Sequence, residues 1–273
     1  MTKLSAEEHV VAIYSSLARA WGRQHWWPAN SRFEVIVGAY LTQNTSWRNV
    51  EIALRELRTA RVLSVEGIRN ISVSRLERLI RSSGYFRQKA RKLKTFVNFL
   101  DQNYGGSLSR MFAQPTAELR EQLLSLNGVG PETADSILLY AGQHPIFVVD
   151  AYTRRMAVRH GILSEDASYE DFRGLFERAL NHAELLPYRG ADARDYMVRI
   201  ETGAHARAGS ATGSAAHRPS RMSLAKRTPL AQVFNEMHGL IVSAGKQFCL
   251  KSKAQCEQCP LGSMLPSAEM SRN

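Results

Sequence analysis

The chain has 273 residues, 44% of them hydrophobic and 22% charged, and a formal net charge of +11. These proportions are ordinary for a globular protein of one or two domains, and no stretch reaches the roughly 18 apolar residues of a membrane span. The N-terminal residues lack the apolar core of a signal peptide, so we expect a cytoplasmic protein. The positive charge favours nucleic acid as partner over an anionic membrane surface, because no strongly amphipathic basic helix is evident.

Helical patterns follow one another along the chain, and the alternation typical of strands is absent, which predicts an all-α protein. The predicted helices cover residues 5–20, 33–41, 47–57, 62–68, 74–82, 88–100, 131–141, 151–160, 169–180 and 234–242. Residues 202–233 contain no Asp or Glu, but they contain five Arg or Lys and a run of small residues. We interpret residues 203–228 as a mobile, basic, low-complexity insertion.

A glycine hairpin, Leu126-Asn127-Gly128-Val129-Gly130, joins two helical patterns, and Pro131 then occupies a first-turn position that needs no backbone donor. Its bare N–H groups can approach a phosphate closely. Such a turn also serves simply to connect two helices. After the hairpin, the apolar run 146–149 ends in Asp150. By itself, Asp150 is most simply the cap of a helix that begins near Ala151.

Taken together, the hairpin, Thr133-Ala134, and Val149-Asp150 followed by Arg154-Arg155 resemble the helix-hairpin-helix DNA glycosylases of the endonuclease III superfamily. The resemblance runs from about residue 26 to about residue 260. It implies a two-domain helical fold. Residues 30–145 would form a helical barrel domain that ends in the hairpin. Residues 1–29 would pack with a C-terminal domain, 146–273, that carries the insertion and a cysteine loop at 249–259.

The resemblance also implies the reaction, which is hydrolysis of the bond between a damaged base and its sugar in double-stranded DNA. Asp150 takes the family's catalytic position, where a carboxylate stabilises positive charge on the sugar and orients water. Gln43 falls where the family fills the gap left by the flipped base, although a solvated turn residue is equally consistent. The predicted DNA contacts of the hairpin are Gly128, Val129 and Gly130, and Arg154 and Arg155 follow Asp150, where they would reach the backbone near the lesion. A basic cluster on one predicted helix is consistent with phosphate contacts or with a solvated face, and it comprises Arg87, Lys89, Arg91, Lys92 and Lys94.

Glu132 departs from the family pattern, because bifunctional members have at this position the lysine that forms a Schiff base and nicks the strand. A glutamate cannot do so, and it suits a first helical turn. We therefore expect a monofunctional glycosylase without lyase activity. A lysine from elsewhere, such as Lys89, would reverse this expectation.

The motif His25-Trp26-Trp27-Pro28, with residues 41–45 and 83–90, resembles the 3-methyladenine DNA glycosylase branch. An electron-poor alkylated purine would stack on Trp26 or Trp27 with a cation–π gain of about 0.5–2 kcal/mol. Both tryptophans are also consistent with a purely structural place in the core. Two rivals stay open: an endonuclease III-like enzyme for oxidised pyrimidines or mismatches, and an inactive DNA-binding module. We expect a monomer.

Three cysteines, Cys249, Cys256 and Cys259, lie near the C-terminus with the spacing C-x6-C-x2-C. In a cytosolic chain such a cluster indicates metal rather than a disulfide. The resemblance implies the family's [4Fe–4S] loop, whose fourth position falls on Leu265. A cluster with a non-cysteine fourth ligand, a labile or three-iron cluster, and a vestigial loop all remain open, and zinc with His238 is a weaker option. Hydrolysis itself needs no cofactor.

Overall fold

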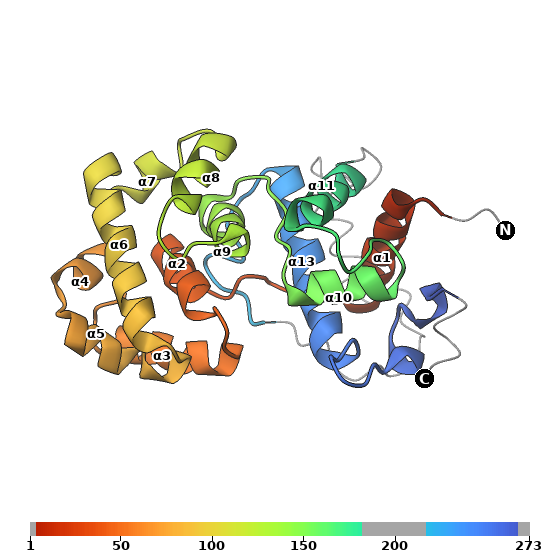
Figure 1. Ribbon diagram of the computed structural model, residues 1–273, viewed down its shortest axis with the longest axis horizontal. Helices are drawn as coiled ribbons and strands as arrows, with labels where there is room; N and C mark the ends of the chain where they lie inside the picture. Colours follow the sequence, from red (N-terminus) through yellow and green to blue (C-terminus); the bar gives the residue numbers. More distant parts are fainter. Residues whose placement is uncertain (1–3, 182–216, 267–273) are drawn as a thin grey trace. The chain divides into compact units, whose positions relative to one another are not determined.

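The computed structural model describes residues 4–181 and 217–266. Within these ranges every regular element is helical and no strand is present, so the all-α prediction is confirmed (Figure 1). None of the helices described there has both the length and the apolar character that a membrane crossing requires. The chain divides into two compact units. The central unit comprises residues 29–144 with 220–222, and the terminal unit comprises the remaining described residues.

The central unit is built around α2 (Arg32–Leu41) and α6 (Phe86–Tyr104). Nine of the ten residues of α2 are buried, which explains why its sequence reads as a continuous apolar run rather than an amphipathic stripe. The other helices of this unit are α3 (Trp47–Thr59), α4 (Val65–Asn70), α5 (Val73–Leu79), η1 (Arg81–Ser83), α7 (Leu108–Met111), α8 (Thr116–Leu124), α9 (Pro131–Ser136) and the π-helical η2 (Ile137–Gly142).

The terminal unit is built around α13 (Pro229–Gln247), which is buried along most of its length. α1 (Ala6–Trp21) packs against α13 and α11 (Tyr169–Leu180), and α10 (Ala151–Arg159) packs against α13. Helix α13 begins before the predicted start at residue 234, because Thr228 caps it and Pro229 occupies its first turn. The cysteine loop adds two short turns, η4 (Cys256–Gln258) and η5 (Gly262–Met264).

The predicted mobile insertion, 203–228, lies outside the described residues up to residue 216. Residues 217–228 belong to the part that the structure describes, and their mobility stays a prediction. Met222 is buried and its backbone N–H donates to the carbonyl of Ala29, whose own N–H donates to the hydroxyl of Ser220. This part of the stretch therefore makes specific contacts that its composition did not indicate.

Candidate active site

The glycine hairpin has the backbone that its sequence predicts. Gly128 has φ of +81°, in the region that favours glycine, and Gly130 is the N-cap of α9, with Pro131 in the first turn. Among the described residues, none accepts a hydrogen bond from the backbone N–H of Gly128 or Gly130. A Cβ built on Gly130 would meet no atom within 4 Å. The hairpin therefore presents bare donors beside open space, as an anion site requires.

Gln43, in the turn after α2, is attached to this hairpin. Its side-chain Nε2 donates to the carbonyl of Gly128 at 3.1 Å and to Oγ1 of Thr133 at 2.9 Å. Its Oε1 accepts from Nζ of Lys92 at 2.7 Å. Gln43 is thus a half-exposed turn residue whose side chain is tied to the hairpin, and its predicted entry into DNA requires these bonds to break.

Lys89 lies inside the central unit. Its side chain is buried, and Nζ donates to the carbonyls of Leu41 and Ser83 at 2.8 and 2.6 Å. Burial, with the nearby charge of Lys92, lowers the pKa of Lys89 to about 8. The prediction that Lys89 contacts DNA disagrees with this burial, because the side chain instead ties the end of α2 to the turn before α6.

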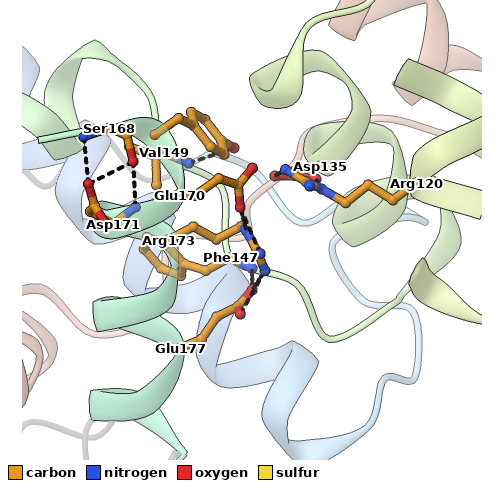
Figure 2. A network of polar contacts seen from close by, with 10 residues as sticks. Arg120, Asp135, Phe147, Val149, Ser168, Glu170, Asp171, Arg173 and Glu177 are labelled. Carbon is orange, nitrogen blue, oxygen red and sulfur yellow. Dashed lines mark hydrogen bonds and ion pairs between the residues drawn. The ribbon is translucent and has the colours of Figure 1, made fainter. Parts of the chain in front are cut away.

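The segment that leads to Asp150 belongs to no strand, so its backbone N–H groups have no strand partner. Side chains of α11 accept their hydrogen bonds instead. The N–H of Phe147 donates to Oε1 of Glu177 at 3.0 Å, and the N–H of Val149 donates to the hydroxyl of Tyr169 at 3.3 Å (Figure 2). Arg173 in turn pairs with the Glu177 carboxylate at 2.8 Å. These contacts satisfy buried backbone donors and fix the chain immediately before Asp150.

Asp150 caps α10, as its sequence alone indicated. Oδ1 accepts from the N–H and the hydroxyl of Thr153 at 2.8 and 3.1 Å. The second oxygen, Oδ2, lies 3.6 Å from Nε2 of His238 on α13. Capping and catalysis therefore use different oxygens and do not exclude each other.

Electrostatics keep this carboxylate ionised. Burial acts to raise the pKa of Asp150, but the charge and hydrogen bonding of His238 and the two Thr153 bonds outweigh it, so the pKa lies below its ordinary value. A partly buried, ionised carboxylate stabilises developing positive charge more strongly than one in water. From the sequence, His238 is part of the resemblance to the 3-methyladenine DNA glycosylase branch and a weak candidate zinc ligand, and its place beside Asp150 was missed.

Both tryptophans of the motif are buried in the terminal unit, with 7% of Trp26 and 5% of Trp27 exposed. The ring of Trp26 lies 5.9 Å, centroid to centroid, from the ring of His238. Trp27 packs edge-on against the ring of Trp26, with a centroid distance of 5.4 Å. The carbonyl of Trp26 accepts from Nδ2 of Asn235. Trp26 is therefore joined to Asp150 through His238, and in this structure both indoles also have the core role that the sequence left open.

Arg154 and Arg155 make intramolecular contacts. Arg154 donates to the carbonyls of Glu165 and Ala167 and lies over the ring of Phe172. Arg155 donates to the carbonyl of Cys249 at 2.6 Å. Each arginine thus anchors α10, and contact with DNA stays a prediction for both.

Two charged residues of α9 differ in burial. Glu132 is exposed in the first turn, as expected for an acid near a helix N-terminus. Asp135 is fully buried and pairs with Arg120 of α8 at 2.7 Å (Figure 2). This pair braces the two helices of the hairpin. Its sequence signal was an acidic residue on the apolar side of a helical pattern.

The three cysteines and Leu265 line one pocket at the end of α10, together with His160 and Arg159. Arg159 donates to Sγ of Cys249 at 3.1 Å. Burial raises the pKa of the Cys259 thiol to about 11, and the other two cysteines add to this effect. In the described ranges no three His, Cys, Asp or Glu side chains form a site for a metal ion, so zinc with His238 does not fit.

A cluster makes a different demand, because its four thiolates bind separate irons and need not converge on one point. Three thiols on one pocket match three of those positions, and Leu265 supplies no donor. His160 is the one imidazole among the lining residues. The pocket lining thus offers three thiols, and a cluster held by them stays a prediction.

An all-α chain with a phosphate-suited glycine hairpin and an ionised Asp at a helix N-terminus belongs to the helix-hairpin-helix class of DNA-acting proteins. The family model that matches residues 37–182 is described as HhH-GPD superfamily base excision DNA repair protein. A candidate DNA repair glycosylase of Methanocaldococcus jannaschii is 38% identical over 255 residues, which cover 93% of this chain and 94% of that protein. The chain belongs to this superfamily, and it is a DNA glycosylase of base excision repair.

Two solved structures share the fold. The 3-methyladenine DNA glycosylase MagIII of H. pylori, crystallised with 1,N6-ethenoadenine, is 25% identical and matches 89% of this chain and 98% of its own with a TM-score of 0.63. An endonuclease III in a non-covalent complex with DNA is 18% identical, with a TM-score of 0.67 and full coverage of both chains. The second likeness, at this identity, concerns the fold alone.

Proposed function

We propose that this protein is a monofunctional DNA glycosylase that releases an alkylated purine, such as 3-methyladenine, and leaves an intact abasic strand. The observation that carries the proposal is Asp150, an ionised carboxylate with one oxygen used for capping and the other facing His238. As the bond to the base breaks, this charge stabilises the cationic sugar, and the carboxylate orients the attacking water.

The absence of lyase activity is supported by the lysines near the hairpin. The family's nucleophile position holds Glu132, and the amine of Lys89 is buried against two backbone carbonyls. Lys92, whose side chain lies against Gly128 of the hairpin, has its amine on the Gln43 amide. A Schiff base needs a free amine at the sugar carbon, and neither lysine offers one in this arrangement.

The alkylpurine substrate is supported by the likeness to MagIII and by the position of Trp26 close to His238. A cationic base is a good leaving group, so a site with a carboxylate and no strong general acid is sufficient. The rival assignment, an endonuclease III-like enzyme for oxidised pyrimidines or mismatches, shares the fold and differs in the base released. An inactive binding module would not require Asp150 to be ionised.

The cofactor completes the proposal. Cys249, Cys256 and Cys259 would hold an iron–sulfur cluster, with His160 as the lining residue able to act as a fourth ligand. The cluster would fix the loop after α13, and no step of the hydrolysis passes through it. Iron and acid-labile sulfide, measured in protein purified without oxygen, test this part independently of activity.

A single-turnover assay on two duplexes tests the function, one carrying 3-methyladenine and the other thymine glycol. Base release and strand breakage are scored separately, with and without alkali, and borohydride is added to trap any Schiff base. We expect release from the methylated duplex, breaks only after alkali, and no trapped adduct. Direct nicking at thymine glycol would contradict both the substrate and the monofunctional assignment.

A further inference from the structure

Lys92 of α6 lies against the first glycine of the hairpin. A Cβ built on Gly128 would fall 2.1 Å from Cε and 2.7 Å from Nζ of Lys92, so the lysine fills the space that the missing side chain leaves. The same Nζ donates to Oε1 of Gln43 at 2.7 Å. A positive charge therefore stands beside Gly128 of the hairpin.

The neighbouring lysines of α6 are used differently. Lys89 is buried against two carbonyls, and Lys94 donates to the carbonyls of Arg69 and Ile71. Lys92 instead is half-exposed, and its hydrogen bond goes to a neutral amide oxygen. It is therefore the lysine of this helix that can exchange its partner for an anion at the hairpin.

A phosphate oxygen is a better acceptor for an ammonium group than an amide oxygen, because the full negative charge of the phosphate adds a Coulomb attraction that a neutral amide lacks. A phosphate received by the N–H groups of the hairpin would compete with Gln43 for Lys92. Gln43 would then lose one of its three bonds and be held only through its amide nitrogen.

We propose that Lys92 binds the DNA phosphate at the hairpin and, by doing so, removes one of the three hydrogen bonds that hold Gln43 in the free protein. Phosphate capture and the loosening of Gln43, which is predicted to enter the duplex, thus become one coupled event. This inference rests on the proposed DNA-repair function for its substrate, but it concerns binding and not base release.

The first test is the salt dependence of binding to an undamaged duplex, measured for the full chain and for Lys92→Gln. Loss of one phosphate contact makes the negative slope of log K against log salt shallower by about 0.9. Arg91→Gln is the matched control, because it removes the same charge from the next, exposed residue of α6. An unchanged slope in Lys92→Gln, or an equal fall in Arg91→Gln, would overturn the phosphate contact.

The second test is a double-mutant cycle between Lys92→Gln and Gln43→Ala, scored as affinity for a duplex with a stable abasic analogue. Coupling predicts that the fold-change caused by Gln43→Ala differs by at least about threefold between the two Lys92 backgrounds. Equal fold-changes would refute the coupling between Lys92 and Gln43. Both tests use binding alone, so a failure here is distinguishable from failure of base release by the unaltered protein.

Discussion

Replacement of Asp150 separates its two roles. The cap is made by Oδ1 with the N–H and hydroxyl of Thr153, and an asparagine oxygen can accept the same bonds. Asp150→Asn should therefore keep the fold and remove only the charge. Asp150→Ala removes both, and it also leaves the first turn of α10 without its side-chain acceptor.

The expected magnitudes differ between the two variants. Loss of one group that stabilises transition-state charge lowers turnover by about 100-fold or more, which corresponds to about 2.7 kcal/mol. Loss of an N-cap side chain costs about 1 kcal/mol of stability, or roughly 2–4 °C in Tm for a chain of this size. Asp150→Asn should thus lose turnover with little change in Tm, and Asp150→Ala should lose both.

Single-turnover base release and thermal unfolding, followed by circular dichroism, give the two quantities. Ser5→Ala is the matched control, because Ser5 caps α1 of the same unit through the N–H of Glu8 at 3.2 Å. It should lower Tm as much as Asp150→Ala and leave turnover unchanged. Retained turnover in Asp150→Asn would refute the catalytic role and leave Asp150 as a helix cap.

Two further predictions concern pH. The variant His238→Gln removes the charge that helps to lower the pKa of Asp150, so that only the Thr153 bonds oppose the effect of burial. The pKa of Asp150 should therefore rise, and the acid limb of the pH–rate profile should move to higher pH. The same limb should not move in His144→Gln, a control in the central unit. Lys89 has its pKa lowered from 10.5 to about 8, so between these values the unfolded chain binds more protons than the folded one and stability rises with pH. The free energy of unfolding of the unaltered protein, relative to that of Lys89→Met, should therefore increase by up to about 3 kcal/mol from pH 8 to 10.5. The neutral amine still donates to both carbonyls over this range. A difference in unfolding free energy that stays constant with pH, measured by urea unfolding, would contradict this.

The helices and the hairpin could be predicted from the sequence because they depend on local physics. Periodicity identified the helices, proline and glycine marked the hairpin, and Asp150 was recognised as a cap from its position before Ala151. Charge composition, in contrast, gave no indication of the contacts made within residues 217–228, where Met222 is buried and bonds to Ala29.

The sequence by itself thus determined the helical class, the hairpin, the candidate carboxylate and the three-cysteine spacing. Only the tertiary structure decided what each side chain contacts, because such partners lie far apart in the chain; Gln43 and Gly128, for example, are 85 residues apart. Lys89 and Lys92 show the difference most clearly. They occupy one helix and look alike as basic residues, and their spacing of three places them on roughly the same face. Their neighbours make the difference, because Lys89 is enclosed by the carbonyls of Leu41 and Ser83, whereas Lys92 reaches Gln43 and the hairpin.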